Sequence, residues 1–291
     1  MDVTLLGTGC PQCDPDRLGP ANLLRHGDTH ILVDCGSGVT QRLVAAGSSG
    51  ARLEAVLLTH LHSDHIVDLF QLIMSSWHQG RARPHRIFGP PGTRAYMDGL
   101  MALWRPEIEQ RIAHERRPSS AGLGVEVTEI SAGTTLAFGD IAVDVVAVEH
   151  QPIRNAFGFV ARAAGRAIAL SGDTARCEAL IAAARGADIL VHECFIHGAM
   201  KPVEGVRTAE GIQAVASYHT LSNEVGGIAA AAGVRCLVLN HFVPTRFDRA
   251  ALLAEVRRDW PGPLVIGEDL MTVDAETLAV SWRGAVLGLG A

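Results

Sequence analysis

Residues 56–66 of the chain read Val56-Leu57-Leu58-Thr59-His60-Leu61-His62-Ser63-Asp64-His65-Ile66. The first four residues are apolar or favour extended backbone, and they predict a strand that ends at Thr59. Four potential metal ligands then follow within six positions: His60, His62, Asp64 and His65. From Ile66 to Trp77 the apolar residues recur with the spacing of one helix face. The ligands are therefore expected on the turn between a buried strand and a helix.

This combination of side chains indicates a metal site. Imidazole and carboxylate groups at such density suit zinc or a similar first-row metal. Alternate positions on a turn can direct His60 and His62 to one side and the Asp64–His65 pair to the other, which implies two metal ions. The alternative is a polar surface turn that binds no metal. Three histidines and an aspartate within six residues of an apolar strand argue against it.

Length leaves one large domain and two separate domains equally open, and the absence of a linker favours one domain. The chain has 291 residues, of which 48% are hydrophobic and 19% charged, and no linker divides residues 1–291. It has no run of eighteen apolar residues, so no membrane span is expected. The first residues, Met1–Gly7, resemble a strand rather than a secretory signal, which predicts a cytoplasmic protein. The six cysteines are scattered and are expected to be reduced and mostly buried.

The charge balance bears on the partners. A net charge of −6 argues against a dedicated nucleic-acid surface, because phosphate contacts need clustered cations. The expected partner is therefore a small-molecule substrate, and a homodimer is compatible with the sequence. Cys10 and Cys13 have the two-residue spacing of redox and zinc motifs, but no second pair completes a zinc site. An inert loop pair and a functional dithiol both remain open.

Residues 78–120 differ in character from the rest. They hold eight arginines against four acids, together with Tyr96 and Trp104. After Gly92-Thr93 a helix is predicted, in which Tyr96, Leu100 and Leu103 share a face. The segment is either a solvated helical insert or a lid that gives the substrate an apolar and cationic wall. The sequence does not separate these two interpretations.

Further along the chain, apolar strands repeatedly end at a histidine or an aspartate. Strands are predicted near 125–130, 134–138, 141–148, 157–163, 167–170, 189–191, 236–239, 264–266, 270–273 and 277–282, and helices near 177–185, 208–216, 222–232 and 248–258, with Ser222 as a cap. His150, Asp173 and His241 follow three of these strands as His60 follows the strand at 56–59. Such side chains can converge at one edge of a sheet system.

The motif series His60-x-His62-x-Asp64-His65, His150, Ser171-Gly172-Asp173-Thr174 and Asn240-His241 resembles that of the metallo-β-lactamase superfamily. The resemblance implies an α/β fold, a four-layer αββα sandwich with two zinc ions at its edge. By this resemblance His60, His62 and His150 would bind one ion and Asp64, His65 and His241 the other, with Asp173 as the bridge. No other cofactor is implied.

Two differences from the motifs of known subgroups restrict the part of the superfamily that this chain resembles. The zinc-binding cysteine of class B β-lactamases has no counterpart, and flavodiiron oxidoreductases have an acid where this chain has His62. His192-Glu193-Cys194-Phe195 and Tyr218-His219-Thr220 resemble segments of the branch shared by tRNase Z and the zinc-dependent arylsulfatases and phosphodiesterases. There the matching pair implies that Glu193 orients His219 as a general acid. The long basic arm of tRNase Z is missing.

These features predict a dinuclear metal-dependent hydrolase of a small anionic ester, an aryl sulfate or a phosphodiester-like compound. Two divalent ions would lower the pKa of water, so that a bridging hydroxide serves as the nucleophile. Asp64 would bind metal and also orient the hydroxide. Three alternatives stay open: a tRNase Z-like RNA 3′-processing endonuclease, a lactonase, and an iron-dependent thiol dioxygenase.

Overall fold

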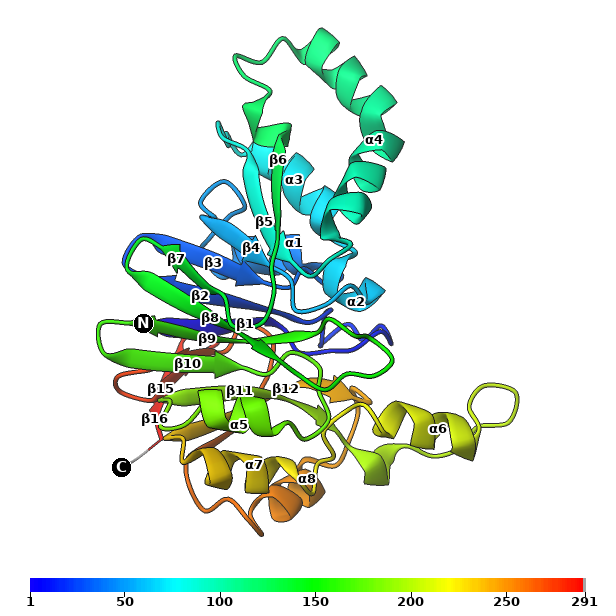
Figure 1. Cartoon of the computed structure of the whole chain (residues 1–291), viewed down its shortest axis with the longest axis vertical. Coiled ribbons are helices and arrows are strands. Elements are labelled where there is room, and N and C mark those ends of the chain that lie inside the picture. The colour runs from blue at the N-terminus through cyan, green and yellow to red at the C-terminus, as the bar shows by residue number, and fades with distance from the viewer. Residues whose placement is uncertain (290–291) are drawn as a thin grey trace.

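The computed structural model describes residues 1–289, which form two β-sheets between layers of helices (Figure 1). The strands are β1 (Asp2–Gly7), β2 (Ala21–His26), β3 (Thr29–Val33), β4 (Ala55–Leu57), β5 (His85–Gly89), β6 (Val125–Glu129), β7 (Thr135–Phe138), β8 (Ile141–Ala147), β9 (Phe157–Ala163), β10 (Arg166–Leu170), β11 (Ile189–Phe195), β12 (Cys236–Val243), β13 (Leu264–Ile266), β14 (Thr272–Asp274), β15 (Ala279–Trp282) and β16 (Ala285–Gly288). The helices are α1 (Val39–Ala45), α2 (Ser63–Ile66), α3 (Leu69–His78), α4 (Thr93–Glu115), α5 (Glu178–Ala183), α6 (Ala209–Ala216), α7 (Val225–Ala232) and α8 (Arg249–Val256), with 3₁₀ turns at Ala121–Leu123 and His197–Ala199.

Each sheet contains a parallel block. The first sheet has the order β16-β15-β14-β1-β2-β3-β4-β5-β6, and β3 to β6 are parallel neighbours. The second has the order β13-β12-β11-β10-β9-β8-β7, with β10 to β13 parallel. The carboxyl ends of parallel strands meet at one edge of a sheet. This arrangement gathers the side chains that follow β4 and β10 with those in the last residues of β11 and β12.

The main core lies between the two sheets. Leu57 of β4 and Leu5 of β1 pack there with Phe159 of β9 and Val191 of β11, all almost fully buried. Val56, the neighbour of Leu57, points to the opposite face and packs beneath the helices, as the two-residue period of a strand requires. Each such buried side chain contributes roughly 1.5–3 kcal/mol by its removal from water.

Helices cover both outer faces. Leu43 of α1 and Leu72 of α3 pack on the first sheet, and Ile181 of α5, Ile228 of α7 and Leu252 of α8 pack on the second. The order of layers is therefore helix, sheet, sheet, helix, which confirms the predicted αββα sandwich.

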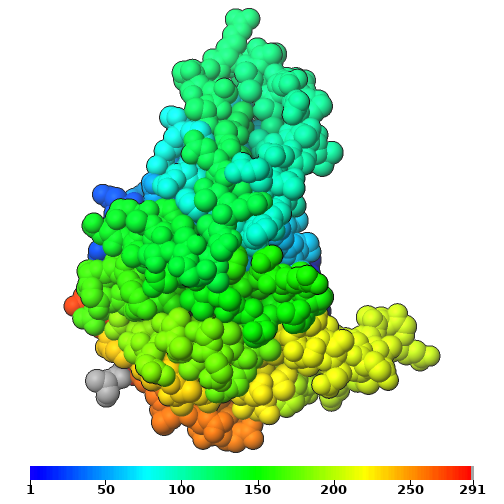
Figure 2. Space-filling model, viewed as in Figure 1, coloured from blue at the N-terminus to red at the C-terminus, as the bar shows by residue number. Residues whose placement is uncertain are grey.

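Two segments project from this body, one containing α4 and one containing α6 (Figures 1 and 2). Tyr96 and Leu100 of α4 pack toward the core, as expected, but Leu103 is 74% exposed. The prediction that Leu103 shares the packed face is wrong, because the buried side of α4 runs through Met97 and Ile108 and Leu103 points away from it. In α6 no residue is buried.

The structure differs from expectation at Ser222 and in β16, and it agrees with expectation for the cysteines. Ser222 does not cap α7, whose N-cap is Glu224. The hydroxyl of Ser222 donates to Glu255 instead, at 2.6 Å. Strand β16 was not predicted. All six cysteines are free and only Cys13 is exposed, which confirms that prediction. Within residues 1–289, every helix is too short or too polar to cross a membrane.

Candidate metal centre and active-site cleft

The ligand-rich turn lies between β4 and α2, as its sequence predicted. The last residue of β4 is Leu57, and α2 begins at Ser63 with His62 as its N-cap. His60 and His65 are buried, whereas His62 and Asp64 are partly accessible. The turn therefore holds two rings in the interior and two groups at the surface of a cleft.

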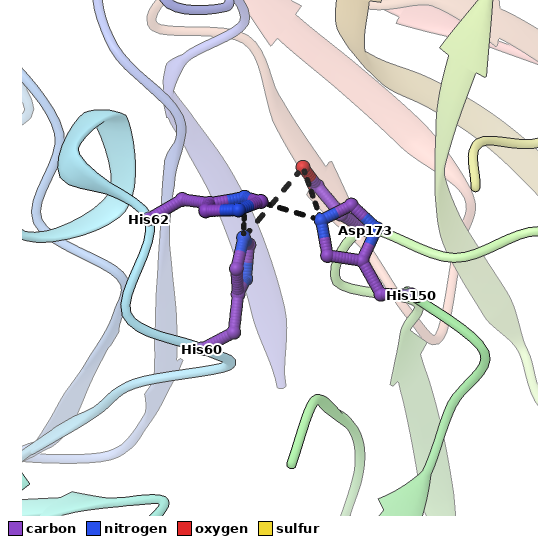
Figure 3. Close-up of side chains that lie close together, drawn as sticks. All are labelled: His60, His62, His150 and Asp173. Carbon is purple, nitrogen blue, oxygen red and sulfur yellow. Dashed lines mark hydrogen bonds and ion pairs between the residues drawn. The ribbon is translucent and has the colours of Figure 1, made fainter. Parts of the chain in front are cut away.

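His60, His62 and His150 form one cluster with Asp173. Nδ1 of His62 lies 2.9 Å from Nε2 of His60 and 3.2 Å from Nε2 of His150. Figure 3 shows these rings and the carboxylate of Asp173 directed at a common centre. A tetrahedral ion with bonds of about 2.0–2.1 Å holds its ligand atoms about 3.3 Å apart. The spacing of the nitrogen atoms is close to that value.

Asp64, His65 and His241 form a second cluster beside the first. Nε2 of His65 and Nε2 of His241 lie 3.6 and 3.4 Å from Oδ2 of Asp64. Both nitrogen atoms are 3.3 Å from Oδ2 of Asp173. The same oxygen lies 3.9 Å from Nε2 of His60, so Asp173 stands between the two clusters. All seven side chains predicted from the sequence as ligands are brought together.

The donor atoms fit a divalent cation. Oδ2 of Asp64, Nε2 of His65 and Nε2 of His241 are shut off from solvent and have no hydrogen-bond partner in the described residues. Each buried polar atom left in that state costs about 1–3 kcal/mol. Burial raises the pKa of Asp173, but the adjacent His241 and His65 outweigh this effect and hold the pKa well below its usual value. An ionised carboxylate among imidazoles is a suitable donor set for a metal such as zinc.

Contacts behind the ligands hold their rings in place. Nδ1 of His65 donates to Asp34 at 2.8 Å, and Nδ1 of His150 donates to the backbone carbonyl of Tyr218 at 2.9 Å. These bonds leave each Nε2 lone pair free for a metal. Asp34 was missed as a site residue. The signal was nevertheless present, because Ile31-Leu32-Val33-Asp34 is another apolar strand that ends at an aspartate.

Local backbone features direct two of the candidate ligands, Asp173 and His241, toward the cluster. Gly172, with φ of +60°, precedes Asp173, and a Cβ there would lie 2.6 Å from the carbonyl oxygen of Phe157. Only glycine fits this close turn. On β12 the pairing with β11 shifts at His241, which is an extra residue between Asn240 and Phe242 and has φ of +42°. Such a bulge redirects a side chain, here toward the metal cluster.

Glu193 and His219 form a hydrogen-bonded pair at the edge of the second cluster. Nδ1 of His219 lies 2.7 Å from Oε1 of Glu193, which also accepts the amide of Thr174 at 2.9 Å. Burial lowers the pKa of His219, but the charge and hydrogen bond of Glu193 outweigh it and raise the pKa to about 9. The ring nitrogen is within 4.8 Å of donor atoms of Asp173 and His241.

A cleft of about 410 Å³ opens over the metal cluster and this pair. Its walls include His62, Asp64, Asp173, His219 and His241 and, away from the ligands, Cys10, Gln12, Met200, Arg207, Val215 and Tyr218. Among the described residues, none from 78–120 lines it. The proposed lid therefore could act only on a substrate that extends beyond the cleft.

Comparisons with known proteins give the family. Residues 29–242 match the model of the beta-lactamase superfamily domain. The chain belongs to the beta-lactamase superfamily. The ribonuclease Z of Mycobacterium marinum is 37% identical over 281 residues, which cover 94% of this chain and 98% of that protein.

Solved structures of the superfamily share the fold. The metallo-β-lactamase fold protein YhfI from Bacillus subtilis superposes with a TM-score of 0.71 at 21% identity, covering 93% of this chain and 98% of its own. Human tRNase Z, short form, gives 0.69 at 22% identity, covering 94% and 99%. As a beta-lactamase superfamily member with these relatives, the chain is a metal-dependent hydrolase of ester bonds.

The expected partner needs correction. We expected a small-molecule ester and argued against nucleic acid, but a ribonuclease that is 37% identical over nearly the whole chain overturns both expectations. The net charge of a protein does not predict whether its cleft binds nucleic acid. A sum of −6 averages the entire surface, whereas phosphate groups respond to the local potential of a cleft that holds divalent ions. An aryl sulfate substrate also has no support among the relatives.

Proposed function

We propose that this protein is a tRNase Z-like endonuclease that cleaves RNA in 3′-end processing. The observation that carries the proposal is the Glu193–His219 pair, joined at 2.7 Å and placed beside the metal ligands. A phosphodiester of RNA has a basic leaving alkoxide, and such a group needs a proton as it departs. Close relatives named ribonuclease Z support the choice of RNA as the substrate.

We further propose that the centre holds two divalent ions, with zinc the expected metal. His60, His62 and His150 would hold one ion, Asp64, His65 and His241 the other, and Asp173 would bridge them. The support is that Oδ2 of Asp173 is within 3.3–4.0 Å of nitrogen atoms in both clusters. Bound ions of this kind lower the pKa of water and stabilise negative charge on a phosphoryl group.

The remaining roles belong to the side chains of the chain itself. His219, held by Glu193 through Nδ1, would present Nε2–H to the leaving oxygen of the RNA. Asp64, which is partly accessible in the cleft, would orient the attacking group as well as bind metal. Asp34 and the carbonyl of Tyr218 would keep the ligand rings in position.

An RNA hairpin with a single-stranded 3′ trailer tests the function. The zinc-loaded protein is expected to release the trailer at one defined position, which sequencing of the products would map. Bis(4-nitrophenyl) phosphate serves as a small phosphodiester for comparison. Hydrolysis of that compound without cleavage of several trailer-bearing RNAs would reject the RNA-processing role while leaving the phosphodiesterase chemistry.

Elemental analysis tests the metal proposal separately. Two ions per chain are expected after purification without chelator and reconstitution with zinc, and Asp173→Ala should lose metal and activity because both clusters lose a ligand. A single ion per chain after reconstitution would contradict the dinuclear site. A single iron would instead favour the dioxygenase alternative.

A further inference from the structure

The segment between the two residues of the pair forms a projecting arm, which we define as residues 197–216. It comprises the 3₁₀ turn His197–Ala199, an exposed loop and α6, and it stands out from the body in Figures 1 and 2. The base of the arm is anchored, because Met200, Ile212 and Val215 pack against Cys10, Phe195 and Val243. The arm therefore forms one wall of the cleft at a set position.

Arg207 extends from the arm into this cleft. Its backbone is fixed by two hydrogen bonds with Val203, of 2.8 and 2.9 Å, which close a small loop over Gly205. Among the described residues that line the cleft, Arg207 is the one lysine or arginine. The exposed Lys201 lies in the same arm but is not part of the lining.

The guanidinium of Arg207 has no anionic partner within residues 1–289. Its Nε is buried without any hydrogen bond, and its one polar contact runs from Nη1 to the sulfur of Met200 at 3.6 Å. Most other arginines here pair with a carboxylate, as Arg17 does with Glu268 and Arg25 with Asp2. A buried N–H of a charged group left unpaired costs more than the about 1–3 kcal/mol of a neutral one.

We propose that Arg207 binds a backbone phosphate of the RNA strand as it lies in the cleft. A guanidinium presents its N–H groups in a planar fork that matches two phosphate oxygens, and Arg207 lines the cleft with no carboxylate partner among the described residues. The inference rests on the proposed function and names a contact on the substrate. The arm would supply this cationic contact at one wall of the cleft.

Substitution of Arg207 tests the contact. Arg207→Ala should lower kcat/KM for the trailer-bearing RNA about 10- to 100-fold, the effect of losing a charge-assisted hydrogen bond. The kcat/KM of Arg207→Lys should lie between those of the wild type and Arg207→Ala, because lysine keeps the positive charge but lacks the planar fork of the guanidinium. Lys201→Ala is the matched control, a cation removed from the same arm outside the cleft, and it should stay within about twofold of the wild type.

Salt dependence separates phosphate binding from a structural role. With kcat/KM measured between about 50 and 300 mM salt, Arg207→Ala should reduce the slope of log(kcat/KM) against log[salt] by about 0.7–0.9, because one phosphate contact is lost. The Lys201 control should keep the wild-type slope. A loss of kcat/KM with an unchanged slope, or unchanged values of both, would overturn the proposal.

Failure of the RNA function would be recognised independently. If the wild type binds the RNA without cutting it, Arg207→Ala must still bind the RNA more weakly than Lys201→Ala. The dependence of its binding constant on salt must also be smaller than that of Lys201→Ala. Unaltered RNA binding in that case would overturn the role of Arg207. Metal content, measured for each variant, should equal that of the wild type because Arg207 contacts no ligand atom.

Discussion

At the scale of single residues, substitution of His219 tests whether this side chain donates a proton to the leaving group. His219→Ala should reduce turnover of RNA by roughly 10²–10⁴-fold, the usual size of general acid catalysis. It should cost far less on bis(4-nitrophenyl) phosphate, whose leaving oxygen needs no proton. Steady-state kinetics on both substrates provide the measurement.

Two controls accompany this prediction. Glu193→Gln should show the same selectivity in weaker form, because it only orients the ring and favours its charged state. Both variants should retain their metal. Equal losses on the two substrates would mean that His219 is not the acid, and metal loss would mean that it is a ligand. A histidine that merely caps a helix would lower stability and leave catalysis nearly intact.

His85 is buried at the start of β5 and does not line the cleft. It should make the free energy of unfolding depend on pH. Burial, together with Arg81 and Arg83, lowers its pKa to about 3. The unfolded chain, in which the ring titrates near 6.5, therefore binds more protons between these two values. The associated stability is complete above about pH 6.5 and is lost as the pH falls toward 3.

Replacement of this ring tests the effect. Between pH 7 and 5 the wild type should lose about 2 kcal/mol more of its free energy of unfolding than His85→Leu, which does not titrate. Urea denaturation at the two pH values would measure both losses, each variant being compared with itself at pH 7. Parallel losses in the two proteins would show that His85 is protonated in the folded state as easily as in the unfolded one.

At the scale of elements, α4 is a long helix that leaves the body of the protein. Trp104 stacks on Phe70 of α3, with ring centroids 4.3 Å apart, so it has a structural contact. Arg105 follows it and is exposed. If α4 provides a wall for RNA that extends beyond the cleft, Arg105→Ala should raise KM about fivefold, the equivalent of about 1 kcal/mol for one exposed ionic contact.

A neighbouring substitution controls for the helix itself. Leu103→Ala removes an exposed apolar side chain from the same turn and should leave KM unchanged. Metal content should be that of the wild type in both variants. Unchanged kinetics for Arg105→Ala and for Trp104→Ala would assign α4 to the solvated scaffold rather than to substrate binding.

At the scale of the whole molecule, the candidate metal site combines side chains from both sheets. His60, His62, Asp64 and His65 follow β4 of the first sheet, whereas His150, Asp173 and His241 come from the second. Metal that binds the folded chain alone should stabilise it by about 4 kcal/mol at a thousand times its dissociation constant. Because both sheets share one core, a single unfolding transition of residues 1–291 is expected.

Thermal unfolding with and without a chelator measures this link. The metal-loaded protein should unfold at the higher temperature, and Asp173→Ala should lose most of the difference because the two clusters would lose the carboxylate that we propose as their bridge. Identical midpoints for the loaded and chelated wild type would contradict the link. Two separate transitions would contradict the single domain.

The sequence by itself predicted most of the strands, the helices that cover them and the candidate ligands at or near the strand ends. Apolar periodicity over a few residues sets which face of an element is buried, and a ligand that directly follows a buried strand must lie at the sheet edge. For this reason the turn at 56–66, His150, Asp173 and His241 could all be predicted before their distances were known.

Only the tertiary structure decided the features that depend on residues far apart in the chain. Asp34 meets His65 across 31 positions, and the bulge at His241 depends on the register between β11 and β12. Arg207 reaches the cleft because the base of its arm packs on Phe195 and Val243. The total charge in the sequence could not locate such a cation, since the local potential depends on which side chains packing brings together.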